Sequence, residues 1–145
     1  IPEDHLFITG DLLGKGGFGE VYLADYNGHN AAAKVWTELP FRRDIKRTLS
    51  QLEAMIRLRS PNTVNVYGAV TSLPDRMVLV MELLVGGDLL TLLRKSAEPL
   101  PEERCRRIIE DICTGMAFLH SKNTIHGDLK SANVLLDGDG RAKVI

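Results

Sequence analysis

The sequence has no long apolar run and almost no net charge, and both absences narrow the classes of protein to which it can belong. Its formal net charge at pH 7 is −1, so no basic field favours nucleic acid or an anionic membrane surface as a partner. No apolar stretch approaches the roughly 20 residues that a membrane-spanning helix needs. We therefore expect no nucleic-acid partner and no membrane segment within this span.

Cysteine is also scarce. The two cysteines, Cys105 and Cys113, fall within one expected helix. At about 1.5 Å of rise per residue their Cα atoms would lie roughly 12 Å apart, beyond the reach of a disulfide. Neither has a Cys or His beside it at metal-ligand spacing. A reduced chain without a secretory signal pattern predicts a cytoplasmic location, or the cytoplasmic side of a membrane protein.

The overall composition is that of a globular domain with a core, since 44% of the residues are hydrophobic and 26% are charged. The chain begins with Ile1 rather than Met, and Ile145 falls inside a strand-like run. We expect it to be part of a longer chain.

A glycine-rich stretch, Gly14 to Gly19, lies between β-prone runs at residues 7–13 and 20–26. Glycines let backbone N–H groups approach phosphates closely. Dinucleotide-binding folds use a similar glycine pattern, but there a helix follows. Here a strand leads to the hairpin signal Asn27-Gly28 and returns at residues 31–36. The pattern predicts a glycine loop that closes a β-hairpin, followed by a third strand, and it disfavours a Rossmann unit.

Lys34 lies on that third strand, and its simplest alternative role is that of an exposed edge-strand lysine. Residues 41–59 carry apolar residues at helical spacing, and Glu53 falls at the edge of the apolar stripe. The alternative role for Glu53 is a weak pair with Arg57 on the same helix. Because that helix is predominantly basic and Glu53 lies at the edge of the apolar stripe, we favour Glu53 as the partner of Lys34.

Two further strands are expected at residues 64–70 and 76–81. Residues 81–87 then read as buried strand followed by a Gly-Gly break, which is either a site offering backbone groups to a ligand or an ordinary strand-to-helix loop. Asp88 is expected to cap a short helix at residues 89–95.

A longer helix is expected from Pro101, over residues 101–121, because proline and two acidic residues open it. Its apolar stripe is typical of core packing. The stripe comprises Cys105, Ile108, Ile109, Ile112, Met116 and Leu119.

The stretch Thr124 to Leu136 gathers an acid (Asp128), a base (Lys130) and an amide (Asn133) within six residues. Phosphoryl transfer uses such a set, as acceptor of the hydroxyl proton, cation for the γ-phosphate and oxygen ligand for Mg²⁺. The alternative is a polar hairpin loop in which Asp128 only caps a turn. A final hairpin is expected around Gly138-Asp139-Gly140.

These landmarks, in this order, resemble a eukaryotic-type protein kinase domain, from the glycine loop to a catalytic loop of the form H-R-D-L-K-x-x-N. Gly127 stands where the family usually has arginine, and the family's Asp-Phe-Gly motif would follow Ile145. The resemblance implies an α+β, protein-kinase-like fold. A five-stranded antiparallel N-lobe with its C-helix would span residues 1–83, and the hinge and a partial helical C-lobe residues 84–145.

The resemblance also implies ATP and Mg²⁺ as cofactors. Asp128, Lys130 and Asn133 would be catalytic, with Asn133 also a metal ligand, and Lys34, oriented by Glu53, would hold the α- and β-phosphates. The remaining positions implied for nucleotide binding are Gly14, Gly16, Gly19, Val21, Ala32, Met81, Glu82, Leu84 and Leu135.

The function implied is a serine/threonine kinase acting on a protein substrate, within the tyrosine-kinase-like group on the wording of the motifs. Residues 1–145 alone are expected to be inactive, with the rest of the C-lobe or a partner covering the 101–121 helix. The alternative is a truncated pseudokinase module that binds nucleotide or a partner without catalysis.

Overall fold

The computed structural model describes residues 1–16, 19–36, 50, 53–73 and 76–145. The chain divides into two compact units. The first comprises Ile1–Arg57 and Asn65–Leu83, and the second Leu58–Val64 and Leu84–Ile145. That these units are the two kinase lobes stays a prediction, and each is described below by itself.

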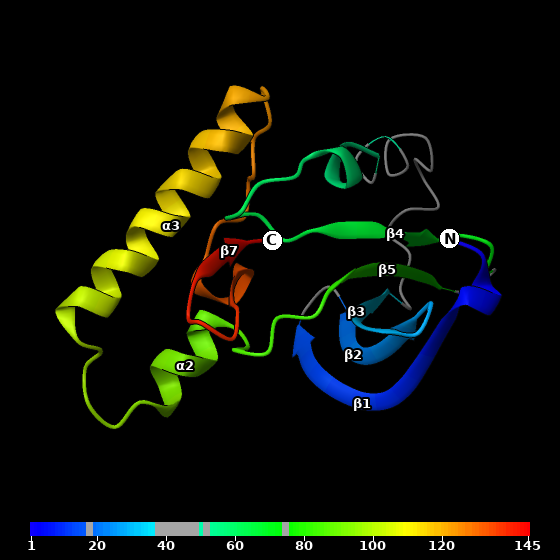
Figure 1. Ribbon diagram of the computed structural model, residues 1–145, viewed down its shortest axis with the longest axis horizontal. Helices are drawn as coiled ribbons and strands as arrows, with labels where there is room; N and C mark the ends of the chain where they lie inside the picture. Colours follow the sequence, from blue (N-terminus) through cyan, green and yellow to red (C-terminus); the bar gives the residue numbers. More distant parts are fainter. Residues whose placement is uncertain (17–18, 37–49, 51–52, 74–75) are drawn as a thin grey trace. The chain divides into compact units, whose positions relative to one another are not determined.

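The first unit is built on an antiparallel sheet that, within the described residues, has five strands in the order β1-β2-β3-β5-β4. Figure 1 shows the consecutive strands β1 to β3 and the neighbouring β4 and β5. The expected five-stranded sheet is therefore confirmed. The strands are β1 (Leu6–Gly16), β2 (Gly19–Tyr26), β3 (His29–Trp36), β4 (Val66–Val70) and β5 (Met77–Glu82).

The turn between β2 and β3 is the two-residue hairpin turn that Asn27-Gly28 predicts. Asn27 and Gly28 have φ angles of 53° and 80°, the left-handed backbone that a two-residue hairpin turn requires. The Asp25 carboxylate accepts a hydrogen bond from the Gly28 N–H at 2.8 Å. This turn fixes the register, so Ala24 faces Ala31 and Val21 faces Lys34.

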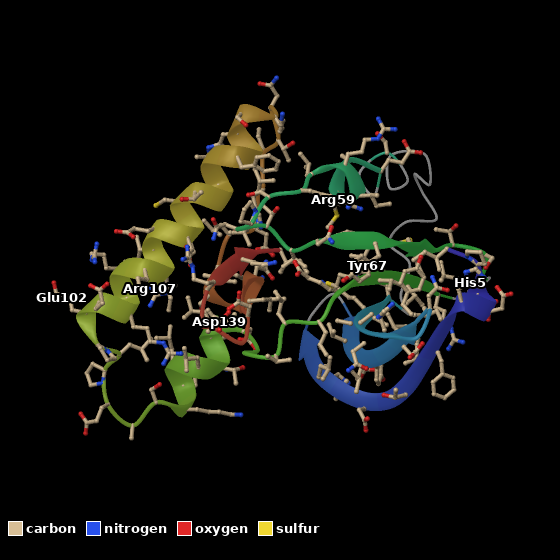
Figure 2. The ribbon with its side chains drawn as sticks, in the orientation of Figure 1. His5, Arg59, Tyr67, Glu102, Arg107 and Asp139 are labelled. Carbon is tan, nitrogen blue, oxygen red and sulfur yellow. The ribbon has the colours of Figure 1, made fainter. Side chains whose placement is uncertain are left out.

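The core of the first unit is made of small side chains, which let the strands be covered closely. Tyr26 packs against this core, and its ring stacks on that of the exposed Tyr67 (labelled in Figure 2), with the ring centroids 5.9 Å apart. The buried members of the core are Ala24, Ala31, Ala33, Val35, Val70, Val78 and Val80.

Most of the helix predicted at residues 41–59 lies outside the described residues. Residues 53–57 are helical, as expected for its last part. A short 3₁₀ turn, η1 (Glu3–His5), precedes the sheet. No helix among the residues that the structure describes combines the length and apolar character that a bilayer crossing requires.

The second unit contains the predicted helices and the final hairpin. Asp88 caps the first helix as expected, because its carboxylate accepts the Thr91 N–H at 2.8 Å. The elements are α2 (Leu89–Lys95), α3 (Glu102–Ser121), η3 (Ser131–Asn133), β6 (Val134–Leu136) and β7 (Ala142–Val144).

The inward face of α3 includes most of the predicted apolar stripe. Ile108 and Leu119 are buried, and Cys105, Ile112 and Met116 are half-buried. Ile109 was wrongly expected in the stripe, since it is 58% exposed. The face also buries Asp111 and Gly115, which apolar periodicity did not pick out because one is charged and the other has no side chain.

Asp111 is the charged residue on that face, and it holds β7 against α3 (Figure 1). Its carboxylate accepts hydrogen bonds from Arg141 Nε and from the Ala142 N–H, both at 2.9 Å, and from Arg141 Nη2. Burial alone would raise the pKa of Asp111, but these hydrogen bonds outweigh it, and the pKa is lowered.

Gly115 permits the second contact of α3. A Cβ atom on Gly115 would lie 2.4 Å from the carbonyl oxygen of Asn62, so only glycine fits there. Asn62 in turn donates its side-chain amide to the Ala142 carbonyl at 3.0 Å and accepts the Val144 N–H at 2.9 Å. The segment around Asn62 therefore lies along β7, opposite its β6 partner.

The hairpin formed by β6 and β7 also binds the Gly86-Gly87 segment, which follows β5 in the chain. The Gly86 N–H donates to the Leu136 carbonyl at 2.9 Å, and the Leu136 N–H donates to the Gly87 carbonyl at 2.8 Å. A Cβ atom on Gly86 would lie 2.6 Å from the Leu136 oxygen. Gly86 is thus required by close approach of two backbones.

We predict that Asp111→Asn lowers the free energy of unfolding at pH 7 by about 1–3 kcal/mol, because buried donors lose a charged acceptor. The carboxylate stabilises the fold above its unfolded-state pKa of 3.8, and this contribution is lost as the pH falls through the lower folded-state pKa. The difference between variant and parent should therefore shrink below about pH 4.

Urea unfolding at pH 7 and pH 3 measures both quantities. The exposed Asp4→Asn variant is the control and should match the parent. An equal loss at both pH values in Asp111→Asn, or no loss at pH 7, would contradict the role given to this carboxylate.

Candidate functional site

The predicted glycine loop closes the β1–β2 hairpin. Gly14 pairs with Val21, and Gly16 pairs with Gly19 beyond residues 17–18, which lie outside the described part of the chain. A Cβ on Gly14 would meet no atom within 4 Å, so its backbone borders open space. Gly19 has a φ of +131°, and a Cβ there would lie 2.3 Å from the Val35 oxygen, so packing alone requires glycine.

A charged network joins the two strands beside the glycine loop. Lys15 and Glu20 face each other across the ladder, with 2.8 Å between Lys15 Nζ and Glu20 Oε1. The Tyr22 hydroxyl donates to Glu20 Oε2 at 2.6 Å. The hydrogen bond from Lys15 lowers the pKa of Glu20, and that from Tyr22 lowers it further. The pairing of Lys15 with Glu20 was not predicted from the sequence, because it depends on the register between β1 and β2.

Lys34 lies on β3, which is flanked by β2 and β5. The alternative of an edge-strand lysine is therefore wrong. The side chain is half-buried, and its Nζ lies 5.4 Å from the centre of the Trp36 ring. Ala32 and Met81, two predicted adenine neighbours, are directly paired across β3 and β5 and are both buried.

Glu53 is exposed on the helical residues 53–57. Among ion pairs between residues that the structure describes, none joins Lys34 to Glu53. The predicted orientation of Lys34 by Glu53 thus stays a prediction.

The predicted hinge residues make backbone and side-chain contacts of their own. The Glu82 N–H donates to the Asn65 carbonyl at 2.9 Å, and a Glu82 carboxylate oxygen accepts the Asn65 N–H at 2.7 Å. The Leu84 carbonyl accepts the Gly87 N–H at 3.3 Å. Leu135, one of the positions implied for nucleotide binding, lies on β6 and forms an isolated β-bridge with Asp88.

The three predicted catalytic residues lie together in the second unit. Lys130 Nζ is 3.0 Å from Asp128 Oδ2. Asn133, the last residue of η3, donates its side-chain amide both to the Asp128 carbonyl oxygen at 2.8 Å and to Oδ2 at 2.9 Å. This arrangement is more than a capped turn, because one carboxylate receives a cation and an amide at the same oxygen.

The charge state of Asp128 follows from these contacts. The hydrogen bond from Lys130 is the largest effect and lowers the pKa of the Asp128 carboxyl; desolvation raises it, and the hydrogen bond from Asn133 lowers it, so the pKa lies below its usual value. The side chain remains 52% exposed. An ionised, reachable carboxylate can accept a proton from an incoming hydroxyl.

His126, which was not among the predicted site residues, stabilises the backbone of the loop that carries Asp128. The Asp128 N–H donates to His126 Nδ1 at 3.1 Å, so Nδ1 must be the acceptor. His126 Nε2 lies 2.8 Å from the Ile145 carbonyl oxygen and donates to it. Between them, Gly127 has a φ of +77°, a left-handed conformation that suits glycine at the position of the family's arginine.

We predict that Lys130→Met raises the pKa of Asp128, and that Asn133→Ala raises it by less, because Lys130 is the larger cause of the lowering. Carbon-detected NMR titration of the carboxyl resonance measures both. Asn123→Ala, an exposed amide near the loop, should leave the pKa unchanged. An unchanged pKa in Lys130→Met would mean that the ion pair does not form in solution.

Comparison with known proteins assigns the chain to a family. A family model described as "Protein tyrosine and serine/threonine kinase" matches residues 7–145. The mitogen-activated protein kinase kinase kinase YODA of Arabidopsis thaliana is 38% identical over 141 residues, which cover 93% of this chain and 16% of that protein. The serine/threonine-protein kinase CTR1 of the same plant is 39% identical over 139 residues, covering 92% and 17%.

A tyrosine kinase is similar as well. The mouse tyrosine-protein kinase Fer is 34% identical over 152 residues, covering 99% of this chain and 18% of that protein. The chain spans between 8% and 31% of the length of such curated relatives. Because the family model extends over almost the whole sequence, the chain belongs to the protein tyrosine and serine/threonine kinase family.

Proposed function

We propose that the protein, at its full natural length, transfers the γ-phosphate of ATP to a serine or threonine hydroxyl of a protein substrate. The observation that carries the proposal is the cluster of Asp128, Lys130 and Asn133, in which one carboxylate oxygen receives both the cation and the amide. Phosphoryl transfer depends on positioning and charge neutralisation, and this cluster supplies both.

Asp128 is the proposed acceptor of the proton of the substrate hydroxyl. Its lowered pKa keeps it ionised at neutral pH, and its exposure leaves an oxygen within reach of a substrate. Lys130, beside it, steadies the transferred phosphoryl group. Because a protein substrate presents the hydroxyl on an extended segment, an exposed base suits the reaction.

Asn133 is the proposed metal ligand, and its orientation fits that role. Its nitrogen is committed to two acceptors on Asp128, so the amide cannot rotate and Oδ1 points away from them. Amide oxygens are among the ligands that Mg²⁺ takes in proteins. Bound Mg²⁺ would neutralise charge on the phosphates.

Residues of the first unit are proposed to hold the nucleotide. Lys34 would bind the α- and β-phosphates, with Glu53 orienting it. The open space beside Gly14 lets phosphate oxygens approach its backbone. The other proposed nucleotide contacts are Gly16, Gly19, Val21, Ala32, Met81, Glu82, Leu84 and Leu135.

The preference for serine and threonine rests on Lys130, because tyrosine kinases usually replace this lysine within the catalytic loop. YODA is described as a kinase of kinases and CTR1 as a serine/threonine kinase, which supports the same preference. Fer is a tyrosine kinase, so the preference needs a direct test.

We predict that Asp128→Asn lowers kcat by about 10²–10⁴-fold, as expected for loss of a general base, with KM for ATP nearly unchanged. The assay follows labelled γ-phosphate from ATP into a protein substrate, with phosphoamino-acid analysis of the product. The exposed Asp4→Asn variant is the matched control and should keep full activity.

The same assay distinguishes an active serine/threonine kinase from a pseudokinase. Phosphoserine or phosphothreonine that disappears in Asp128→Asn supports the proposal, and phosphotyrosine would overturn the residue preference. If the full-length protein binds Mg·ATP yet transfers no phosphate to any substrate, the pseudokinase alternative holds.

A further inference from the structure

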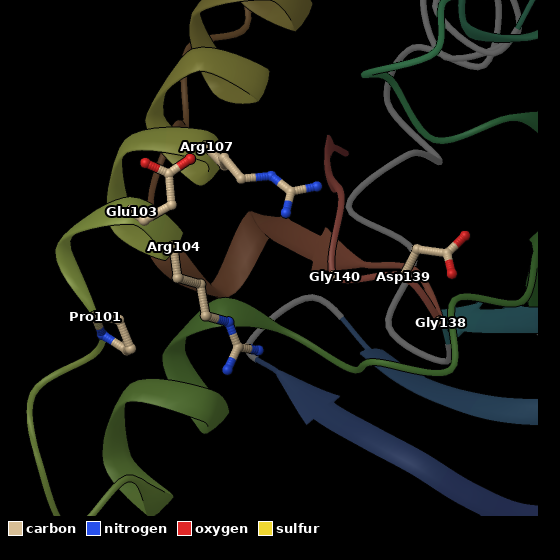
Figure 3. Close-up of a pocket in the computed structure, with 7 residues that line it drawn as sticks. All are labelled: Pro101, Glu103, Arg104, Arg107, Gly138, Asp139 and Gly140. Atoms are coloured by element: carbon tan, nitrogen blue, oxygen red, sulfur yellow. The ribbon is translucent and has the colours of Figure 1, made fainter.

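A cavity of about 490 Å³ lies in the second unit, apart from the Asp128 cluster. It opens between the first turns of α3 and the turn that joins β6 to β7 (Figure 3). In Figure 2, Arg107 lies on α3 and Asp139 on that turn. The lining residues are Pro101, Glu103, Arg104, Arg107, Gly138, Asp139 and Gly140.

Two guanidinium groups reach into this cavity. Arg104 and Arg107 are exposed residues three positions apart on α3 and both line the cavity. In Figure 3 the Arg107 side chain extends toward the turn, and the Arg104 side chain extends toward α2. Neither makes a hydrogen bond or an ion pair with any residue in the part of the chain that the structure describes. Two fixed positive charges therefore share one hollow without a bonded counter-charge.

Two carboxylates, those of Glu103 and Asp139, also line the cavity, and Glu103 interacts electrostatically with Arg107. Glu103 is bound by Arg106 through two hydrogen bonds, of 2.9 and 2.7 Å, which lower the pKa of that carboxyl. Glu110 also pairs with Arg106, at 3.0 Å. In Figure 3 the Asp139 carboxylate points away from both cavity arginines.

The turn opposite the arginines is rigid and small. The Asp137 carboxylate accepts the N–H groups of Asp139 and Arg141, both at 2.9 Å, which fixes the turn. Gly138 and Gly140 place no side chain in the cavity, so a ligand can approach the backbone closely. The cavity is thus bounded on the α3 side by the two arginines and the Arg106-paired Glu103, and on the other side by a glycine-rich turn that carries Asp139.

We propose that this cavity binds a phosphorylated side chain of a protein segment. Two guanidinium groups match a phosphoryl group of charge about −1.5 to −2, whereas one carboxylate would neutralise only one of them. Arginine binds phosphate oxygens through paired N–H groups. The volume exceeds the needs of a bare anion and admits the residues that flank the phosphate.

Fluorescence anisotropy tests the proposal with the full-length protein in the absence of nucleotide. The probe is a labelled heptapeptide that carries one phosphoserine among alanines and glycines. We expect Arg104→Gln combined with Arg107→Gln to weaken binding at least tenfold, because the charge-assisted hydrogen bonds are lost. Arg59→Gln, at an exposed arginine that does not line the cavity, is the matched control and should leave the affinity unchanged.

Two further peptides identify the ligand chemistry. The peptides with unmodified serine or with glutamate at the same position should bind at least tenfold more weakly. Equal binding of the glutamate peptide would overturn the proposal in favour of an acidic segment. Competition by inorganic phosphate at the peptide's own concentration would overturn it in favour of the free anion.

A second measurement uses the unmutated protein, so that its result does not depend on whether the double variant folds. The phosphopeptide should shift the backbone amide NMR signals of Gly138, Asp139 and Gly140. Shifts confined to other residues, or equal binding by the double variant, would overturn the site. Because no ATP is present, failure here leaves the proposed transfer reaction untouched, and failure of that reaction leaves this site untouched.

Discussion

The second unit depends on one buried carboxylate, that of Asp111. It binds Arg141 and the Ala142 backbone, so the start of β7 is fixed to α3. Strand β7 then holds β6 on one side and the segment around Asn62 on the other. Because β6 directly follows η3, the strand pairing also places Asn133. A buried ion pair adds little stability over an apolar pair, but breaking it is costly, so its value here lies in specifying one arrangement.

The loop that carries the Asp128 cluster shows how this scaffold positions the side chains proposed to be catalytic. Asn133 stands at the end of η3, and its amide reaches back over five residues to Asp128. His126 secures the other side of the loop through the Asp128 N–H. Hydrogen bonds to both the backbone and the side chain of Asp128 therefore fix its position, while its carboxylate stays exposed. Pre-organisation of this kind lowers the cost of reaching the transition state, because the protein need not reorganise during the reaction.

The fold was largely predictable because local signals determine its elements. Asn27-Gly28 specifies its hairpin and Asp88 caps its helix as the sequence indicated. Apolar periodicity predicted most of the buried face of α3, but it could not place Asp111 on that face, because Asp111 is charged. The order and spacing of the motifs pointed to the Asp128 cluster. The hydrogen bonds within this cluster could not be predicted from the sequence, because they depend on the geometry of the loop. Whether Lys34 pairs with Glu53 could not be predicted from spacing alone, because it depends on where the helix of Glu53 lies relative to β3.

The central claim is that the Asn133 amide is oriented by Asp128 to present its oxygen to a nucleotide-bound metal. NMR of the side-chain amides in the full-length protein, with Mn²⁺ and ATP, tests it directly. We expect selective paramagnetic broadening of the Asn133 amide signal, with the exposed Asn123 amide unaffected and the effect absent when ATP is omitted. Equal broadening of both amides, or none at Asn133 with saturating Mn·ATP, would contradict the account.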